Sequence, residues 1–223
     1  MIFFSFSLYG TLDMYTKGMI ENVKIINVRF PNAIIQIYIA DDVPINIRNI
    51  LVEMQNVRLI DVRNKPGIQN MFDRFKAIDD PDCTIMIVRD ADSRIHDRDH
   101  SCIEDFLNSD KVLHIIRDHK FHNTLILGGL WGIKKIGLNE EITTIIQKWI
   151  SMYNQFYKGI DQRFLAQTIY PLLRSKALIH DRYKFYEPID ELTPFRIEIK
   201  DRLFCGQVHR YDSDGIEYTE FDP

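Results

Sequence analysis

Hydrophobic positions along this chain follow two spacings that alternate with each other. Short runs rich in β-branched residues predict strands at residues 2–8, 33–40, 57–62 and 84–88. Between these runs, hydrophobic residues recur at the spacing of one helix face and predict helices at residues 11–28, 45–55 and 68–78. Strands that alternate with helices form a largely parallel sheet covered on both faces. The expected class is therefore a three-layer α/β/α fold with right-handed crossovers.

The pattern becomes less regular after residue 95. We expect helices at residues 100–108, 140–153 and 162–170, and strands at residues 112–117 and 177–180. A short apolar piece at residues 124–127 runs into a pair of glycines, and β-like segments occur around residues 196–199 and 203–208. The chain contains no internal repeat, low-complexity tract or linker, so residues 1–223 are expected to form a single domain.

The composition narrows the class of protein. Hydrophobic residues make up 45% of the chain and charged residues 27%, which is ordinary for a soluble globular protein, and a net charge of −4 argues against a nucleic-acid binder. The apolar residues 2–9 lack a basic segment before them and are too short to span a bilayer, so we expect neither a targeting signal nor a membrane span. Three widely spaced cysteines suit neither a disulfide framework nor a zinc site and indicate a reducing compartment: Cys83, Cys102 and Cys205.

The strongest chemical signal is a pair of carboxylates directly after the fourth predicted strand. Asp90 and Asp92 follow the apolar run 84–88 and are separated by a single residue. Two neighbouring carboxylates repel each other unless a cation neutralises them, and hard divalent ions prefer oxygen ligands. Open α/β sheets also bind ligands beyond the carboxyl ends of their strands. An Asp-X-Asp at this position therefore indicates a metal and phosphate site, although a solvated turn rich in Asp has a similar sequence.

The glycine-rich residues 128–134 allow two interpretations. Three glycines in this segment would let a ligand approach the backbone closely, while Trp131 offers a stacking face and Lys134 a charge. The alternative is a tight turn with Trp131 in the core. The spacing of glycine, lysine and serine or threonine that defines a Walker loop is missing.

Three further segments carry chemistry that also has a structural explanation. Asp161 precedes a predicted helix, so it is either an N-cap or a carboxylate that faces the cleft. His180 follows a predicted strand and could complete a metal shell, although most such histidines are polar surface residues. A third segment follows a predicted strand and could contact a phosphate or an acceptor hydroxyl through Arg117, Asp118, His119 and His122, but a loop of solvated charges is the more common explanation.

In chain order, these segments resemble the nucleotide-sugar-dependent glycosyltransferases of the GT-A fold, in particular small members from bacteria and large DNA viruses. The resemblance covers residues 2–207 and rests most on residues 90–94 and 128–134. It implies a GT-A (Rossmann-like) fold with a nucleotide-binding half to about residue 95 and an acceptor and sugar half after it. It also implies transfer from a UDP- or GDP-sugar to a glycan, lipid or protein acceptor in the cytoplasm, which is the host cytoplasm for a viral member.

The resemblance further implies a metal-dependent mechanism. A Mn²⁺ or Mg²⁺ ion at the Asp-X-Asp would bridge the donor diphosphate and stabilise the leaving group as a Lewis acid. Asp92 is expected to be the firmest metal ligand, and His180 the third contact. Asp90 is expected to be a ligand or a partner of the donor ribose.

The other implied contacts come from both halves of the chain. Asp161 is the expected catalytic carboxylate, and Asp118 and His119 are the alternative bases. Donor contacts are expected from Tyr9 and Gly10 near the base, from Arg74 and less strongly Arg63 at the diphosphate, and from Gly128, Gly129 and Trp131 at the sugar.

Two other functions fit the same residues. A haloacid-dehalogenase-type phosphohydrolase also has an Asp-X-Asp after an apolar strand, with the first Asp as nucleophile. That motif normally follows the first strand of its fold, whereas three strand–helix units precede it here. The second alternative is a non-catalytic module that binds a nucleotide sugar, and the presence of Asp90, Asp92 and Asp161 argues against it.

Overall fold

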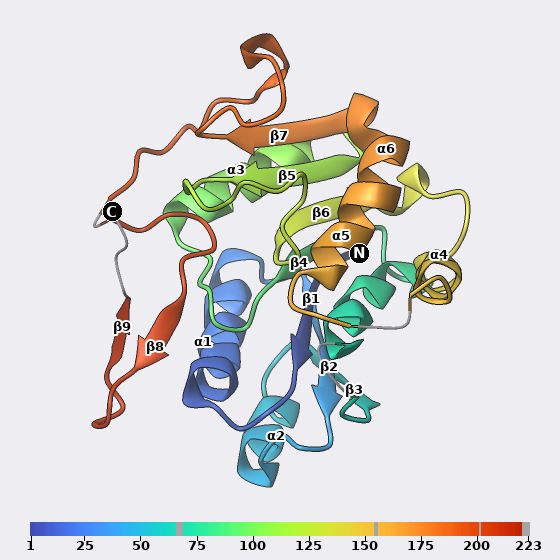
Figure 1. The fold of residues 1–223 in the computed structure, drawn as a ribbon. Coiled ribbons are helices and arrows are strands. Elements are labelled where there is room, and N and C mark those ends of the chain that lie inside the picture. Colours follow the sequence, from blue (N-terminus) through green and yellow to red (C-terminus); the bar gives the residue numbers. More distant parts are fainter. Residues whose placement is uncertain (66–68, 154–155, 201, 220–223) are drawn as a thin grey trace.

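Seven strands of the chain form one central sheet (Figure 1). The computed structural model describes residues 1–65, 69–153, 156–200 and 202–219. The strands lie in the order β3-β2-β1-β4-β6-β5-β7. Their bounds are β1 (Ile2–Leu8), β2 (Ile34–Ala40), β3 (Val57–Val62), β4 (Ile85–Arg89), β5 (Leu113–Arg117), β6 (Leu130–Lys134) and β7 (Ala177–Asp181). Strand β6 is antiparallel to its neighbours β4 and β5, and the other pairs are parallel. The prediction of a mostly parallel sheet is confirmed, and both halves of the chain contribute strands to it.

Helices cover both faces of this sheet, as the alternating pattern predicted. One face packs against α1 (Asp13–Arg29), α2 (Ile45–Val52) and α3 (Asp97–Asn108). The other face packs against the 3₁₀ segment η1 (Gln69–Asp79) and against α4 (Ile142–Ile150), α5 (Ile160–Phe164) and the π-helical segment η3 (Leu165–Ile169). Shorter elements complete the chain: α6 (Tyr170–Leu173), η2 (Lys135–Gly137), η4 (Arg174–Lys176) and η5 (Ile189–Glu191). None of the described helices combines the length and the apolar character that a membrane crossing requires.

Polar side chains of β1 fix η1 over the sheet. Side chains alternate along a strand, and Ser5 and Ser7 both point to the face that η1 covers. Ser5 Oγ donates a hydrogen bond to the carbonyl oxygen of Arg74 (2.5 Å), and Ser7 Oγ donates one to the carbonyl oxygen of Asn70 (2.6 Å). These two bonds hold Arg74 at a fixed height above the sheet, close to the carboxyl ends of β1 and β4.

Most predicted elements of the first half are present, with small shifts at their ends. The predicted bounds of β1 and β3 agree with the structure. The helix expected at residues 45–55 ends at Val52, and the segment expected at residues 68–78 is the 3₁₀ segment η1, whose predicted first residue lies outside the described part of the chain. Local periodicity therefore located these elements well, but it did not distinguish a 3₁₀ segment from an α-helix.

One prediction for the second half is wrong, and one strand was not predicted. The apolar piece at residues 124–127 lies outside the strands, and the unpredicted strand β6 begins directly after the two glycines that follow it. The β-like segments around residues 196–199 and 203–208 form no strands, contrary to the prediction. A small antiparallel pair, β8 (His209–Tyr211) and β9 (Glu217–Thr219), follows them. Strand β6 is short and contains a glycine, so its state is set by pairing with β4 and β5 and not by its own sequence.

Candidate functional site

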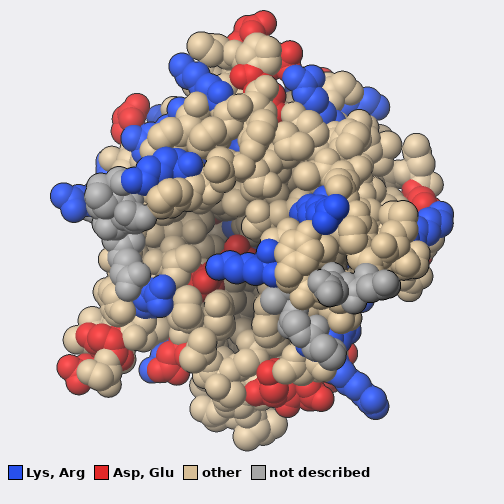
Figure 2. Space-filling view, viewed as in Figure 1, with Lys and Arg blue, Asp and Glu red and all other residues tan. Residues whose placement is uncertain are grey.

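A pocket of about 490 Å³ opens at the edge of the sheet where β1 and β4 end and β6 begins. This volume lies within the range of small-molecule sites. Figure 2 shows the pocket as a hollow with acidic side chains at its floor and a basic side chain that reaches across it. Its lining comes from separate segments of the chain: Ser7, Tyr9, Tyr15, Met71, Arg74, residues 90–92, His122, residues 127–130, Lys158, Gly159, Asp161, Gln162, Gly206 and Val208.

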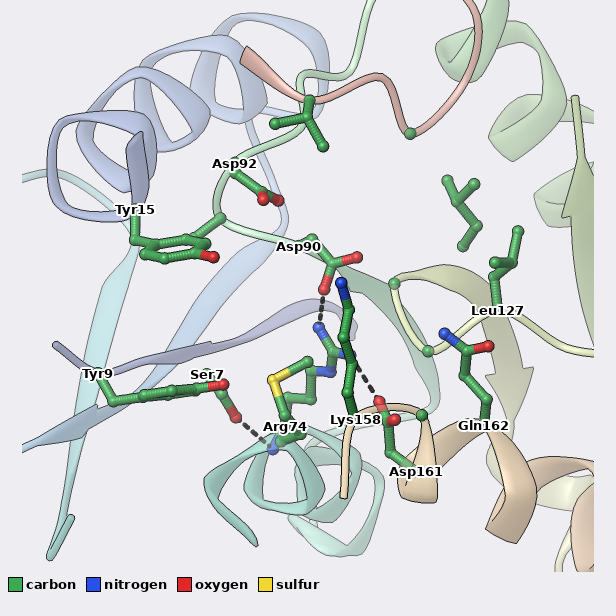
Figure 3. Close-up of a pocket in the computed structure, with 18 of the residues that line it drawn as sticks. Ser7, Tyr9, Tyr15, Arg74, Asp90, Asp92, Leu127, Lys158, Asp161 and Gln162 are labelled. Atoms are coloured by element: carbon green, nitrogen blue, oxygen red, sulfur yellow. Dashed lines mark hydrogen bonds and ion pairs between the residues drawn. The ribbon is translucent and has the colours of Figure 1, made fainter. Parts of the chain in front are cut away.

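The carboxylates of Asp90 and Asp92 lie on the turn that follows β4, and both line the pocket (Figure 3). The turn is held from two sides. Asn22 Nδ2 on α1 donates a hydrogen bond to the carbonyl oxygen of Ala91 (3.1 Å), and the backbone N–H of His209 donates one to the carbonyl oxygen of Asp92 (2.7 Å). These two bonds fix the backbone of the Asp-X-Asp from both sides, so that both carboxylates line the pocket.

The charged form of Asp92 is unfavourable in this environment. Burial and the neighbouring Asp90 raise the pKa of Asp92 to about 6, against the opposing effect of Arg74 and Arg94. Asp90 pairs with Arg74, whereas Asp92 forms no ion pair with any described residue. A cation placed between the two carboxylates would remove this cost, so the donor set fits a hard divalent ion such as Mn²⁺ or Mg²⁺.

These two carboxylates would supply only part of a metal shell. Nowhere in the described ranges do three or more His, Cys, Asp or Glu side chains form a group that could hold a metal ion. Divalent ions of this class commonly complete their coordination with water and with phosphates of the substrate.

Arg74 is a buried cation at the floor of the pocket. Its side chain is 2% exposed and forms ion pairs with Asp90, through Nη1, and with Asp161, through Nη2 at 3.1 Å (Figure 3). Burial alone would lower the pKa of Arg74, but the two carboxylates outweigh burial and raise it. Arg74 therefore stays charged and joins two acidic residues that are far apart in the sequence.

Gly128 and Gly129 allow these acidic side chains to lie against the β6 side of the pocket. A Cβ atom on Gly129 would overlap the carboxylate of Asp90, and one on Gly128 would overlap the carboxylate of Asp161. The glycines are thus required by the close approach of the protein's own carboxylates. Their predicted contact with a donor sugar stays a prediction.

Asp161 lies on the first turn of α5 and does not cap that helix. The N-cap is Gly159, whose φ of 89° is a left-handed conformation that favours glycine. No side-chain hydrogen bond caps this helix, and the carboxylate of Asp161 pairs with Arg74 instead. The N-cap interpretation is therefore wrong, and the structure places Asp161 in the pocket together with Gln162.

Two tyrosines line the side of the pocket that lies opposite Asp161 and Gln162 (Figure 3). Tyr9 follows β1, and Tyr15 lies on α1. Burial is the main cause that raises the pKa of each phenol, so both rings stay neutral at physiological pH. Neutral aromatic faces beside a cluster of charges could bind a nucleobase by stacking.

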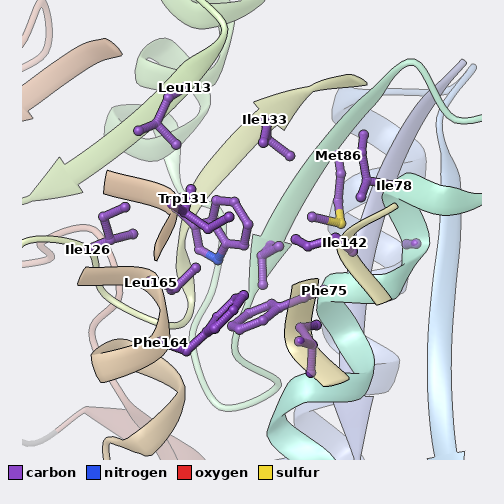
Figure 4. Packing of buried hydrophobic residues seen from close by; sticks show 14 of the residues in the cluster. Phe75, Ile78, Met86, Leu113, Ile126, Trp131, Ile133, Ile142, Phe164 and Leu165 are labelled. Carbon is purple, nitrogen blue, oxygen red and sulfur yellow. The ribbon is translucent and has the colours of Figure 1, made fainter. Parts of the chain in front are cut away.

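Trp131 belongs to the core and not to the pocket. Its side chain is fully buried on β6, and its ring packs edge-on against Phe75 with 5.2 Å between centroids (Figure 4). Because side chains alternate along β6, Leu130 lines the pocket and Trp131 points to the opposite face. The predicted stacking role of Trp131 is therefore wrong.

His180 is also far from the carboxylates. It lies on β7, the edge strand that β6 and β5 separate from β4. Its side chain is fully buried, and its ring nitrogens contact His114 (3.2 Å) and Asp105 (3.3 Å). The prediction that His180 completes a metal shell with Asp90 and Asp92 is contradicted by this position in the sheet.

The predicted alternative bases, Asp118 and His119, contact other residues outside the pocket. Asp118 is fully buried, and its carboxylate accepts hydrogen bonds from Arg98 (2.7 and 2.8 Å) and from the backbone N–H of Cys205 (2.9 Å). His119 stacks on Phe204 with 4.3 Å between ring centroids. Neither residue lines the pocket, so their assignment as bases is wrong.

Two predicted donor contacts also lie outside the pocket. Arg63 is exposed after β3, and two strands separate β3 from β4. Gly10 follows Tyr9 in a left-handed conformation but does not contribute to the lining. After β1 the chain places Tyr9 at the pocket and then turns away from it at Gly10.

Several lining residues were missed by reasoning from the sequence. The approach of the C-terminal segment, with Gly206 and Val208, is set by a long-range backbone bond and gave no local signal. Tyr15 lies within a predicted helix, where its position suggested only helix packing. Lys158 also gave no local signal, because a single lysine before a glycine is common in surface turns.

No family model matches the chain, and no curated protein matches it by sequence. Several solved structures are similar to it. One is the galactosyltransferase LgtC in complex with donor and acceptor sugar analogs, at 15% identity and a TM-score of 0.55, over 81% of this chain and 73% of that chain. Another is a glycosyltransferase involved in the glycosylation of the major capsid of PBCV-1, at 14% identity and a TM-score of 0.51, over 82% of each chain.

A third similar structure carries a different name. It is the 4-diphosphocytidyl-2C-methyl-D-erythritol synthase of Anaerococcus prevotii, at 12% identity and a TM-score of 0.53, over 85% of this chain and 94% of that chain. At such identities the likeness concerns the fold. It confirms the predicted GT-A (Rossmann-like) arrangement, and the choice of reaction depends on the residues of the pocket.

Proposed function

We propose that this protein is a metal-dependent glycosyltransferase that moves a sugar from a nucleotide-diphosphate sugar to an acceptor hydroxyl. One observation carries the proposal. The pocket at the carboxyl end of β4 contains Asp90 and Asp92, and Asp92 has no cationic partner among the described residues. The similar folds of two chains named as glycosyltransferases support it.

Asp90 and Asp92 would hold the Mn²⁺ or Mg²⁺ ion. When bound, such an ion supplies Lewis-acid stabilisation of the departing diphosphate. Arg74 fixes the orientation of Asp90 through their ion pair, so that the carboxylate does not need to reorganise when the donor binds. Tyr9 and Tyr15 would contact the nucleoside on the opposite side of the pocket.

Asp161 and Gln162 would contact the sugar on the side of the pocket formed by α5. In the transfer, the bond between the anomeric carbon and the phosphate oxygen breaks, and its electron pair stays on the phosphate. The acceptor oxygen forms the new bond to the anomeric carbon, and its proton passes to the departing diphosphate oxygen, which carries the electron pair of the broken bond. The pairing of Asp161 with Arg74 favours a role in orienting sugar hydroxyls, because a nearby cation lowers the basicity of a carboxylate.

The proposal includes an acceptor that is a glycan, a lipid or a protein, and a cytoplasmic site of action. A cytoplasmic location agrees with the reducing compartment that the cysteine spacing indicates. Cys83, Cys102 and Cys205 are buried free thiols in the structure.

The phosphohydrolase alternative agrees less well with the architecture. The Asp-X-Asp follows β4 and not the first strand, and the antiparallel strand β6 lies directly beside it. A phosphohydrolase would also need a nucleophilic first Asp, whereas Asp90 is paired with the buried Arg74.

A thermal-shift screen tests the proposal directly. UDP- and GDP-sugars are added with Mn²⁺ or with a chelator, and the donor that raises the melting temperature only with Mn²⁺ is then used in a transfer assay. Release of a nucleoside diphosphate supports the proposal. Release of phosphate from a generic phosphoester, or of pyrophosphate from a nucleoside triphosphate, with no stabilisation by any nucleotide sugar, would contradict it.

A further inference from the structure

Of the two cations that line the pocket, Arg74 is already paired with carboxylates of the protein and is not available to a ligand. Three carboxylates line the pocket, those of Asp90, Asp92 and Asp161, together with two cations, Arg74 and Lys158. The guanidinium of Arg74 is buried and already pairs with Asp90 and Asp161. Lys158 is exposed and has no ion-pair or hydrogen-bond partner among the residues that the structure describes.

The backbone brings Lys158 to the mouth of the pocket. Lys158 directly precedes Gly159, whose left-handed conformation begins α5 and places Asp161 at the floor. In Figure 3 the Lys158 side chain extends from this turn toward Asp90, and Figure 2 shows a basic side chain that crosses the hollow. An exposed ammonium group therefore lies at the mouth of the pocket, close to the acidic floor.

We propose that the ammonium group of Lys158 binds the terminal phosphate of the nucleoside diphosphate, which is the leaving group of the transfer. This inference rests on the proposed function and names a residue that would act in it. A divalent ion and Arg74 together would carry three positive charges, and the carboxylates of Asp90, Asp92 and Asp161 balance them. Lys158 is then the remaining positive charge in the pocket lining for the diphosphate.

The need for this charge increases during the reaction. Each phosphate of the donor carries a negative charge, and a further negative charge develops on the terminal phosphate when the electron pair of the sugar–phosphate bond moves to its oxygen. An ammonium group on a flexible stem can follow that oxygen as the bond breaks, because a lysine binds phosphate as a point charge. Lys158 should therefore contribute to diphosphate affinity and to turnover without contributing to the stability of the fold.

The test compares diphosphates with monophosphates. Affinities of UDP, GDP, CDP and ADP and of the matching monophosphates are measured by isothermal titration with Mn²⁺ for the wild type, Lys158→Met and Lys158→Arg. The matched control is Lys176→Met, since Lys176 is exposed at the opposite end of the sheet, before the start of β7. We expect Lys158→Met to lower the affinity for the nucleoside diphosphate by about 10- to 100-fold, the usual range for loss of a hydrogen bond to a charged group.

The monophosphate should lose much less affinity, because the proposed contact is to the terminal phosphate. Lys158→Arg should restore most of the diphosphate affinity, and Lys176→Met should change neither value. An equal loss for both nucleotides, or no loss in Lys158→Met, would overturn the role of Lys158 while leaving the proposed function intact. If the wild type binds no nucleoside diphosphate, the proposed function fails and this inference fails with it.

Discussion

Asp92→Asn should stabilise the metal-free protein, although the residue lies in the proposed active site. The environment of Asp92 disfavours its ionised form, since burial and the neighbouring Asp90 raise its pKa from 3.8 to about 6. Asn is close in shape to Asp but stays neutral at every pH. The substitution therefore removes a charge that the folded protein holds at a cost.

The size of the effect follows from linkage. The folded protein binds the Asp92 proton more tightly than the unfolded chain, so the free energy of unfolding falls as pH rises from about 4 to about 6, and the full cost remains above pH 6. At about 1.36 kcal/mol for each pH unit, the ionised Asp92 costs about 3 kcal/mol at pH 8 and about half of that at pH 5. The free energy of unfolding of Asp92→Asn should exceed that of the wild type by these amounts at pH 8 and pH 5.

Denaturant unfolding at pH 5 and pH 8 in the presence of a chelator measures this gain. The matched control is Asp90→Asn, which should shift stability in the opposite direction because it removes a partner of the buried Arg74. A second measurement adds Mn²⁺, which should raise the melting temperature of the wild type and leave that of Asp92→Asn unchanged.

Two results would refute this reasoning. An Asp92→Asn protein that is no more stable than the wild type at pH 8 without metal would show that the ionised Asp92 carboxylate does not destabilise the folded protein. Equal stabilisation of the wild type and Asp92→Asn by Mn²⁺ would remove Asp92 from the metal site.

Three further substitutions separate the roles of neighbouring residues. Gly129→Ala should displace the Asp90 carboxylate, reduce metal-dependent transfer by about 10-fold or more and lower the melting temperature, because Asp90 is an ion-pair partner of the buried Arg74; full activity with an unchanged melting temperature would show that the carboxylate can move at no cost. Asp161→Asn should lower turnover by about 100-fold, the scale of a misplaced substrate, and also lower the free energy of unfolding, because Arg74 loses one of its two carboxylates; near wild-type turnover in a direct assay would leave Asp161 with a structural role only. Trp131→Phe should lower the free energy of unfolding by about 1 to 3 kcal/mol and leave nucleotide affinity unchanged, and a loss of affinity without a loss of stability would return Trp131 to the pocket.

The sequence by itself determined the strands and helices of the first half. Buried parallel strands are continuous apolar runs, and the helices between them repeat apolar residues at the spacing of one face, so both are encoded locally. The Asp-X-Asp was also readable, because two neighbouring carboxylates at the end of an apolar run are costly unless a cation neutralises them. Together these features were enough to predict the fold class and the edge of the sheet where the pocket lies.

Only the tertiary structure decided which candidates meet in the pocket. Trp131 and His180 carried the right chemistry, but the alternation of β6 turns Trp131 into the core, and the strand order puts His180 on the far edge of the sheet. Asp161 joins the site through Arg74, which is 87 residues away in the sequence, and the C-terminal segment reaches the turn of Asp92 through a backbone hydrogen bond from His209 and a bridge between Ser93 and Val208. Contacts of this kind depend on how strands are ordered and where loops return, and a local pattern of hydrophobic and polar residues does not encode that order.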